Sequence, residues 1–370
     1  MGVSIYSLTS SGSNIFAGTH SSGVLQSTNN GISWAQTNLK NIVVFSMASS
    51  GNKIFAGTYN SLFYSTNYGY SWNHISLNNR YVYSITTSGS NIYTGTSASG
   101  VFRSTNNGDN WTQTALNNQN VYSLAINGSN IFAGTYYYGV FLSTNNGDNW
   151  AQTALNNQNV SSLAVIGDFI FAGTYSNGVF LTTNDGNSWT QTNMQNITVN
   201  SLVVYGENIF AGTGEIGVLL STNYGSTWIQ KNEGFNTTPS ISSLLIANNC
   251  IFVSSYDKSI WYRSYNDIIG VHSPEIPTEY SLSQNYPNPF NPITNIRYQI
   301  AKSIKRETSD VKLIIYNLLG KEVETIINEM QSPGIYEVSW DGREYSSGIY
   351  FYSLFVDGNK IDTKRAVLIK

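Results

Sequence analysis

The stretch SNIFAGTYYYGVFLSTNNGDNW, residues 129–150, contains two phrases that recur along the chain. Its last eight residues, STNNGDNW, occur a second time at residues 104–111, and four related octapeptides lie elsewhere. The Trp that closes each octapeptide returns after 38 or 39 residues, at Trp34, Trp72, Trp111, Trp150, Trp189 and Trp228. A fixed period of about 40 residues is typical of a repeat architecture.

A second phrase follows the same period and adds one further copy. IFAGT begins at Ile15, Ile54, Ile131, Ile170 and Ile209, with IYTGT at Ile92 and IFVSS at Ile251. A strand-like segment precedes each copy and carries one serine in register, at Ser7, Ser46, Ser84, Ser123, Ser162, Ser201 and Ser243. The unit therefore occurs seven times, and its last copy has lost the Gly and the Trp.

Each unit is expected to form four short strands. In the fourth unit these cover residues 121–126, 130–135, 140–145 and 150–154, which are rich in β-branched and aromatic residues and separated by Gly/Asn/Ser turns. Seven four-stranded units predict a seven-bladed β-propeller over residues 1–272, because radial repetition protects the sheet edges. The fold class is therefore all-β.

The octapeptide, Ser/Thr-x-Asn-x-Gly-x-x-Trp, is expected to be the turn between the third and fourth strands. Gly accommodates a positive φ, Asn can accept hydrogen bonds from N–H groups two residues on, and Trp supplies buried area. We interpret these boxes as scaffold, formed by Asn29, Gly31, Trp34, Asn67, Gly69, Trp72, Asn106, Gly108, Trp111, Asn145, Gly147, Trp150, Asn184, Gly186, Trp189, Asn223, Gly225 and Trp228.

The box resembles the Asp-box, or BNR, repeat of sialidase-like propellers, and its repeat type is similar to that of photosystem-assembly propellers. That family usually has Asp at the third position, whereas all six copies here have Asn. The resemblance covers about 230 residues and implies the fold alone, since one fold hosts many functions. No metal and no cofactor is expected, because the box lacks the formal charge and the three His residues are scattered.

The face opposite the boxes is expected to carry the functional loops. The residues that follow each GT place His20, Tyr59, Tyr136, Tyr137, Tyr175 and Tyr256 around one mouth of the ring. These side chains form either a surface for a glycan or protein ligand, or an ordinary set of strand-end tyrosines. We call them the crown.

Glu215 and Asp257 come from neighbouring units on the same face. As a pair they are the best candidates for a glycosidase, which needs two carboxyl groups about 5–10 Å apart in a cleft. The other interpretation is solvated surface charge. Sialidases use three Arg residues against the carboxylate of their substrate. The ring has Arg80, Arg103 and Arg263, and Arg103 lies directly before a box, near the opposite face, so a sialidase is not expected. Xyloglucan hydrolases with this type of repeat use two rings with a cleft between them, whereas one ring is expected here.

Charge is sparse in the ring. Residues 1–270 contain 7 Lys+Arg and 9 Asp+Glu, and the whole chain has a net charge of −3. Without a basic stripe, nucleic acid is not an expected partner. No apolar run approaches the length of a membrane span. The function predicted first is therefore non-enzymatic binding, with a secreted glycoside hydrolase as the alternative.

The last hundred residues differ in character. After a linker at 273–279, residues 280–370 show alternating apolar residues separated by turns, which predicts a small immunoglobulin-like β-sandwich. NYPNPFNP (285–292), IYNLLGKEV (315–323), SGIYFYSL (347–354) and a basic-apolar end occur in that order.

Together these four motifs resemble the type A C-terminal sorting domain of the type IX secretion system of Bacteroidota and their relatives. The resemblance implies a sorting signal that includes Pro287, Asn288, Pro289, Phe290, Gly348, Lys364 and Lys370. It implies recognition by the secretion machinery, removal by a surface sortase-like protease, and a secreted or outer-membrane-surface location. Such cargo is expected to begin with a secretory signal. MGVSIYSLTSSG has neither a basic end nor an apolar run, so the signal is expected to have been removed or to precede this start.

Overall fold

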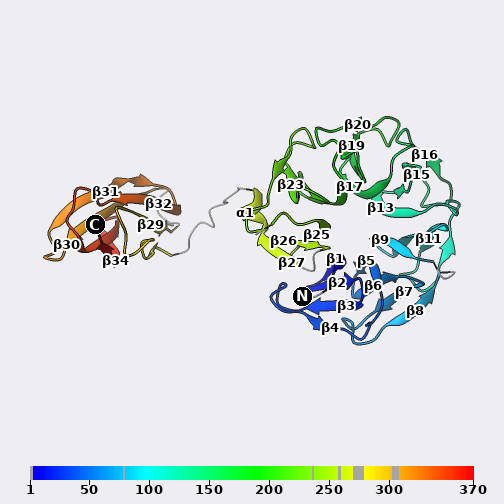
Figure 1. The fold of residues 1–370 in the computed structure, drawn as a ribbon, viewed down its shortest axis with the longest axis horizontal. Helices are drawn as coiled ribbons and strands as arrows, with labels where there is room; N and C mark the ends of the chain where they lie inside the picture. Colours follow the sequence, from blue (N-terminus) through cyan, green and yellow to red (C-terminus); the bar gives the residue numbers. More distant parts are fainter. Residues whose placement is uncertain (1–2, 78–79, 236, 257–259, 270–278, 302–307) are drawn as a thin grey trace. The chain divides into compact units, whose positions relative to one another are not determined.

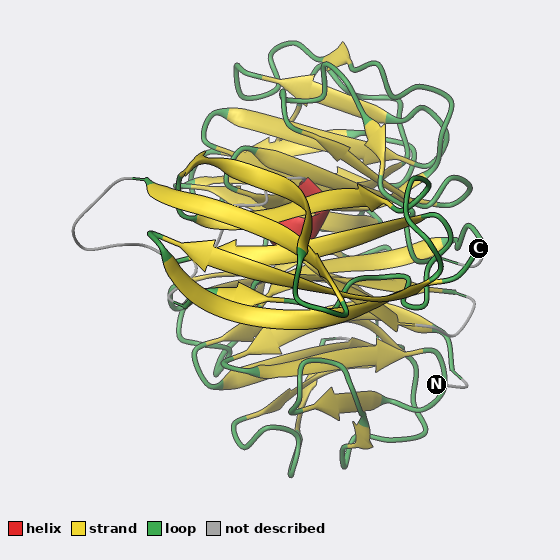
Figure 2. Cartoon of the chain, turned by 90° about the vertical axis from the view of Figure 1, so that its left-hand side faces the viewer, coloured by secondary structure: helices red, strands yellow, loops and turns green. Residues whose placement is uncertain are grey.

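The computed structural model describes residues 3–77, 80–235, 237–256, 260–269, 279–301 and 308–370. The chain divides into two compact units, Met1–Ile269 and Gly270–Lys370, and each has its own hydrophobic core. Apart from Glu279, the predicted linker at 273–279 lies outside the described residues. Strands dominate both units, and Figure 2 shows one short helix in red, α1 (Tyr265–Ile269), among the described residues.

The first unit is a seven-bladed β-propeller, which confirms the fold predicted from the repeat (Figure 1). Six blades are four-stranded antiparallel sheets in sequence order, and the seventh has three described strands. The first strands of neighbouring blades contact one another around the axis, so they form the inner wall. They are β1 (Ile5–Ser11), β5 (Val44–Ser50), β9 (Val82–Ser88), β13 (Val121–Asn127), β17 (Val160–Ile166), β21 (Val199–Tyr205) and β25 (Ile241–Ala247).

The remaining strands of each blade follow outward in sequence order. The second strands are β2 (Asn14–Thr19), β6 (Lys53–Thr58), β10 (Asn91–Thr96), β14 (Asn130–Thr135), β18 (Phe169–Thr174), β22 (Asn208–Thr213) and β26 (Cys250–Ser255). The third are β3 (Val24–Ser27), β7 (Ser61–Ser65), β11 (Gly100–Ser104), β15 (Val140–Ser143), β19 (Val179–Thr182), β23 (Val218–Ser221) and β27 (Ile260–Ser264). The outer ones are β4 (Ala35–Gln36), β8 (Asn73–Ser76), β12 (Thr112–Gln113), β16 (Ala151–Gln152), β20 (Thr190–Gln191) and β24 (Ile229–Gln230).

The second strands supply most of the core because side chains alternate between the two faces of a strand. In β14, Phe132 packs against the following blade, in one cluster with Val160. Its neighbours Ile131 and Ala133 pack against the preceding blade. All three are at most 1% exposed, so each repeat of IFAGT holds its blade between two others. Burying one such Phe contributes about 1.5–3 kcal/mol to folding.

Among the described strands, the ring closes between blade 7 and blade 1 without exchanging a strand, because every propeller sheet consists of consecutive strands. Phe252 of β26 packs into the core of blade 1. Asn248 donates its amide to Oδ1 of Asn30 at 2.8 Å, and Ser4 donates its hydroxyl to the carbonyl of Tyr256 at 2.8 Å. Side-chain packing and a few hydrogen bonds therefore form the seam.

Blade 7 replaces its missing box with α1. In the other six blades the box Trp packs against the preceding blade, as Trp150 does beside Tyr93. The corresponding space between blades 6 and 7 holds Tyr265 and Ile268 of α1, each 5% exposed. The Tyr265 hydroxyl accepts from the Asn208 amide at 2.5 Å. In the seventh copy of the repeat, which lacks the box Trp, Tyr265 therefore fills the corresponding space.

The second unit is a small β-sandwich, as predicted. One sheet is β28 (Ser281–Leu282), β29 (Ile293–Ile300) and β32 (Gly334–Asp341), and the other is β31 (Glu322–Gln331), β30 (Ser309–Asn317), β33 (Gly348–Val356) and β34 (Asn359–Leu368). Alternate residues of β30 are buried, and Phe290 and Trp340 lie in the core with ring centroids 5.1 Å apart.

The strand prediction for the fourth unit differs from the structure at four ends, and the inner strand, predicted to end at residue 126, ends at Asn127. The third strand, predicted over 140–145, ends at Ser143, and the fourth, predicted over 150–154, is Ala151–Gln152. The third strand stops early because the Ser143 hydroxyl accepts a hydrogen bond from Gly147 N–H at 2.8 Å, which bends the chain into the box.

Candidate binding site at the propeller mouth

One face of the ring gathers the starts of the inner strands and the ends of the second strands, because β13 and β14 pair with Val121 opposite Thr135. The residue after each GT is tied to this face. Tyr136 N–H donates to the carbonyl of Asn120 at 3.0 Å, and Tyr175 N–H donates to that of Asn159 at 3.0 Å. The crown residues therefore project from loops fixed to the inner wall. We call this face the mouth.

A cavity of about 400 Å³ opens at the mouth, within the range of about 300–1,000 Å³ usual for small-ligand sites. Seven of the lining residues, which we call the cavity floor, are the second residues of the seven inner strands. These seven equivalent positions are Tyr6, Phe45, Tyr83, Tyr122, Ser161, Asn200 and Ser242. The rest of the lining is Tyr136, Asn159, Val160, Tyr175 and Tyr256.

Aromatic rings form a continuous arc along one side of this cavity. Tyr6 stacks on Phe45 at 5.8 Å with an interplanar angle of 7°, and Phe45 meets Tyr83 edge-on at 5.7 Å. Tyr83 stacks on Tyr122 at 4.6 Å, and Tyr122 meets Tyr136 at 5.7 Å. We call these five side chains the aromatic arc. Each is half-buried, so the rings support one another and still present surface to the cavity.

Amide and hydroxyl groups form the other side. Asn200 donates its amide to Ile241 O at 2.8 Å, and Asn159 accepts from Tyr137 N–H at 2.6 Å. Ser161 donates to Gly173 O at 3.0 Å. We call Asn159, Ser161, Asn200 and Ser242 the polar arc. The first three side chains are held by backbone groups of the ring, and the Ser242 hydroxyl is hydrogen-bonded to that of Ser254 at 3.0 Å.

Burial raises the pKa of two phenols of the aromatic arc, Tyr6 and Tyr83. It raises the pKa of Tyr83 to about 12, and the neighbouring Tyr122 phenol adds to the effect. Burial also raises the pKa of Tyr6 and of Tyr256. These groups carry their protons at neutral and mildly alkaline pH, so they can donate hydrogen bonds.

The structure places the predicted crown residues in two positions. Tyr136, Tyr175 and Tyr256 line the cavity. The other three pack behind or beside other rings: His20 lies 5.6 Å from Tyr6, Tyr59 lies 4.4 Å from Tyr81, and Tyr137 lies 3.9 Å from Tyr136.

The inner-wall aromatics were not among the residues predicted for the site. Tyr6, Phe45, Tyr83 and Tyr122 each precede one of the serines that keep register along the repeat. Their common position in the unit was a signal that could have found them, because neighbouring residues of a strand face opposite sides. A residue beside the registered serine, at the start of an inner strand, faces the axis.

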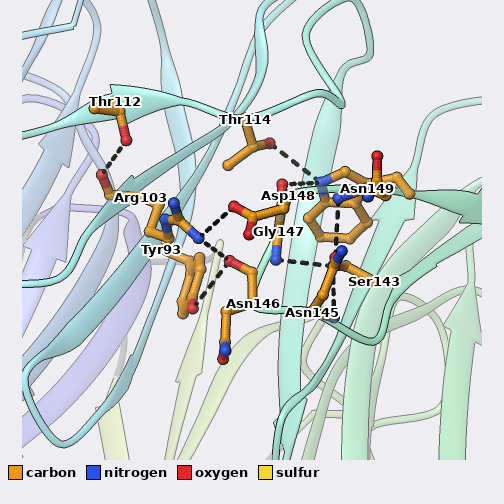
Figure 3. Close-up of polar contacts among 11 residues, drawn as sticks. Tyr93, Arg103, Thr112, Thr114, Ser143, Asn145, Asn146, Gly147, Asp148 and Asn149 are labelled. Atoms are coloured by element: carbon orange, nitrogen blue, oxygen red, sulfur yellow. Dashed lines mark hydrogen bonds and ion pairs between the residues drawn. The ribbon is translucent and has the colours of Figure 1, made fainter.

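The two carboxylate candidates do not form a described pair. Glu215 is exposed, and its Oε2 accepts from Thr198 N–H at 3.2 Å. Asp257 lies outside the described residues. Arg103 lies away from the mouth: it forms a 2.9 Å ion pair with Asp148 and donates to Asn146 O at 2.7 Å in the box of the next blade (Figure 3).

The boxes act as turns, through a different hydrogen bond from the one expected. Asn145 Oδ1 accepts from the N–H of Asn149, four residues on rather than two, at 2.9 Å, and it also accepts from Ser143 Oγ at 3.0 Å (Figure 3). Gly147 has a φ of 94°, as the sequence requires. Trp150 Nε1 reaches Thr114 Oγ1 of the preceding blade at 3.2 Å. In this box the side chains of Ser143, Asn145 and Trp150 are therefore hydrogen-bonded within the scaffold.

The boxes lie on the face with the first turns. Lys53, which begins β6 directly after the first turn of blade 2, donates to Asn107 O and to Asp109 of the blade 3 box, both at 2.9 Å. The cavity lies at the other end of the inner strands.

In the second unit, the NYPNPFNP motif is bound to the end of the chain. Asn288 accepts from Val367 N–H at 2.9 Å and donates to Arg365 O at 3.0 Å. Phe290, flanked by Pro289 and Pro292, is 2% exposed, and its N–H donates to Val367 O at 2.9 Å. Two motifs separated by about seventy residues thus form one surface.

Other predicted sorting residues lie at the same end of the sandwich or on β34. Lys370 donates from its ammonium to Arg343 O at 2.7 Å, and Gly348 begins β33, opposite Leu368. Lys364 pairs with Asp362 at 2.9 Å. Pro287 accepts at its carbonyl from Thr294 Oγ1 at 2.8 Å.

The family described as "Secretion system C-terminal sorting domain" matches residues 284–370. This match confirms the sorting domain expected from the motifs. No curated protein matches the sequence. In the described part of the chain, the one helix is far too short to cross a membrane.

Solved structures share the propeller fold at low sequence identity. YCF48 from Cyanidioschyzon merolae is 14% identical, with a TM-score of 0.58, over 71% of this chain and 95% of that one. YCF48 is also known bound to D1 peptide. The GH74 xyloglucanase from Xanthomonas campestris is 12% identical, with a TM-score of 0.59, over 80% of this chain and 58% of the enzyme.

BamB from Moraxella catarrhalis is 14% identical, with a TM-score of 0.51, over 70% of this chain and 85% of that one. These neighbours include both an enzyme and proteins of other kinds, so the likeness shows the fold alone. The chain is a seven-bladed β-propeller that ends in a type IX secretion system C-terminal sorting domain, which implies secretion or export to the cell surface.

Proposed function

We propose that this protein is an exported binding protein, and that its propeller holds a ligand at the mouth without chemically changing it. The observation that supports this proposal is the cavity of about 400 Å³ with an aromatic side and an amide and hydroxyl side. Concave sites with a mostly apolar lining and a few convergent polar groups are the usual form of ligand sites. A rigid inner wall also keeps these groups in position before the ligand arrives.

The second part of the proposal concerns delivery. The sorting domain brings the chain to the type IX machinery, a surface protease removes residues 280–370, and the propeller is then attached to the outer surface or released. In this proposal the boxes, which resemble Asp-boxes, only hold the blades together. The proposed domain boundaries are those of the sequence analysis: the propeller at 1–272 and the sorting domain at 280–370.

The ligand is a glycan or a protein. Tyrosine rings serve both, because they combine a flat apolar face with a polar tip at low entropic cost. Among proteins with a similar fold, YCF48 is known with a bound peptide and a GH74 member is a xyloglucanase. A glycoside hydrolase is the alternative, and Glu215 with Asp257 remains its candidate pair.

The test uses the purified full chain against a panel of immobilised polysaccharides and peptides, scoring retention of the protein and release of reducing ends. We expect retention without release. Tyr136→Ala, which removes a ring from the cavity wall, is expected to weaken retention about tenfold, since an aromatic contact contributes about 0.5–1.5 kcal/mol beyond its buried area. Tyr70→Ala is the matched control, because Tyr70 lies in a box turn and is 80% exposed.

The opposite results are equally definite. Release that disappears in Glu215→Gln or Asp257→Asn would identify an enzyme. Retention that Tyr136→Ala leaves unchanged would place the binding site elsewhere. Absence of retention on the whole panel would contradict binding at the mouth.

A further inference from the structure

The seven equivalent positions of the inner wall are unevenly distributed around the axis. Four consecutive blades contribute aromatic side chains there, and the next three contribute Ser161, Asn200 and Ser242. If these side chains served only to fill the space around the ring axis, we would expect similar side chains at all seven positions. The cavity instead has one apolar wall and one polar wall, and its lining residues carry no formal charge at neutral pH.

The apolar wall is suited to a flat, uncharged face. Tyr83 and Tyr122 stack at 4.6 Å with an interplanar angle of 29°, so the two rings act as one aromatic unit, which we call the platform. Phe45 meets Tyr83 edge-on and stacks on Tyr6, so these two rings continue the apolar wall beside the platform. The ring faces attract the C–H groups of a ligand, and the phenols at the edge supply hydrogen-bond donors.

The polar wall offers both a donor and an acceptor. Asn200 uses its Nδ2 for Ile241 O, which leaves its Oδ1 as an acceptor among the described contacts. Asn159 uses its Oδ1 for Tyr137 N–H, which leaves its Nδ2 as a donor. Because each amide is anchored at one end, the free end is held in place. The ligand must therefore both donate and accept on this side.

These requirements favour one chemical class. A carboxylated sugar or a charged peptide would lose hydration without meeting an opposite charge on the lining, which is costly. A purely aromatic ligand would leave the two amide ends unpaired, which is also unfavourable. A neutral sugar ring has a C–H face for the platform and hydroxyls that donate and accept. We propose that the cavity binds a neutral sugar unit of a glycan, with its C–H face on Tyr83 and Tyr122 and its hydroxyls toward Asn159 and Asn200.

This inference rests on the proposed function, namely that the mouth binds a ligand. It adds the ligand class and the orientation. The cavity volume is near the lower end of the usual range, so the site takes a terminal or projecting part of a glycan rather than a long stretch.

The experiment measures binding of the full chain to neutral oligosaccharides (gluco-, xylo-, manno- and galacto- series) by calorimetry. Uronic-acid oligosaccharides of the same length and an uncharged peptide library serve as the competing classes. We expect at least one neutral series to bind at least tenfold more tightly than its uronic-acid counterpart. We also expect affinity to stay within about twofold when salt rises from low to high ionic strength, because no charge pair is formed.

Variants separate the two walls. Tyr122→Ala is expected to weaken neutral-sugar binding about tenfold, whereas Tyr122→Phe, which keeps the platform, stays within about threefold. Asn200→Leu removes the free acceptor and is expected to weaken binding about tenfold. Asn200→Leu also removes the hydrogen bond from Asn200 to Ile241 O, so the melting temperature of this variant is measured as well. The melting temperatures of the Tyr122→Phe and Tyr70→Ala variants serve as the reference for a fully folded chain. A loss that exceeds any change in folded fraction supports the assignment.

Each other outcome has a defined meaning. Equal or tighter binding of the uronic-acid series, or neutral binding that Tyr122→Ala does not weaken, overturns the neutral-sugar site. If only a peptide binds and Tyr122→Ala weakens it, the sugar inference fails while the proposed function stands. If no ligand responds to Tyr122→Ala, both fail.

Discussion

At the scale of single residues, burial in the mouth keeps the Tyr83 phenol protonated to a higher pH. Tyr83 lies between Phe45 and Tyr122, and desolvation with the neighbouring phenol raises its pKa to about 12. A free tyrosine titrates near pH 10, so the folded chain keeps this proton to a higher pH than the unfolded chain does. The resulting stabilisation is complete below about pH 10 and is lost as the pH rises from about 10 to 12.

Tyr83→Phe is therefore expected to flatten the pH dependence of stability. Because Phe cannot titrate, the free energy of unfolding of the variant should fall less between about pH 10 and 11.5 than that of the parent. Urea unfolding at several pH values measures this. Tyr70→Phe, which removes a phenol from an 80% exposed side chain, is the control. Parallel profiles for the Tyr83→Phe variant and the parent would contradict the assignment.

The sequence indicated part of this site. Tyr136 and Tyr175 follow the GT of their repeats, and Tyr256 follows the equivalent Ser254-Ser255 of the seventh copy; loop position alone predicted that the three share one mouth. The cavity floor was missed because Tyr6, Phe45, Tyr83 and Tyr122 lie inside strands that also read as ordinary core. Their shared position before the registered serine was the available signal, and it identifies the axis side only once the packing of the blades is considered.

At the scale of elements, the turns differ in how closely another backbone approaches them. Gly139, before β15, has a φ of 66°, and a Cβ there would lie 1.8 Å from the carbonyl oxygen of Leu155. Gly128, in the β13–β14 turn, has a φ of 60° and nothing within 4 Å of a Cβ. The two glycines share a left-handed conformation, and only the first is also a point of close contact.

Gly139→Ala and Gly128→Ala should therefore separate the two effects. Gly128→Ala is expected to cost about 1–2 kcal/mol of unfolding free energy, from the left-handed conformation alone. Gly139→Ala should cost about 1–3 kcal/mol more, because the methyl group meets a backbone atom that cannot rotate away. Chemical denaturation of the two variants gives both values. Similar losses would mean that the loop at Leu155 moves aside freely.

The elements themselves were largely predictable, and the exceptions have local causes. The strand at 130–135 was placed correctly, since the IFAGT pattern and its flanking turns define it. The replacement of the seventh box by α1 was not foreseen. Tyr265 and Ile268 lie in a segment with no counterpart in the other repeats. Their role is seen only in the structure, where they fill the space between blades 6 and 7 that a box Trp fills elsewhere.

At the scale of the whole molecule, the chain combines two units with separate cores. The core of the second unit draws only on residues from Leu282 to Leu368, and those of the first draw on residues up to Ile269. Units with their own cores generally fold independently. The function of one can then be altered without changing the other.

Removing residues 270–370 is accordingly expected to leave the melting temperature of the propeller unchanged. In a host with the type IX system, the same truncation should keep the protein inside the cell, because the sorting domain is lost. Calorimetry of the full and shortened chains and fractionation of the culture measure the two effects. A shift of the propeller midpoint by about 2–4 °C, or about 1 kcal/mol, would show that the second unit stabilises the first. Normal export of the shortened chain would contradict the sorting role.

The seam between blades 7 and 1 has a consequence for how such a ring can change over generations. Since each sheet is formed by consecutive strands, one blade corresponds to one uninterrupted stretch of coding sequence. Duplication or loss of such a stretch would leave every other blade intact. The two blades at the seam are held by side chains, so only those contacts would have to be remade.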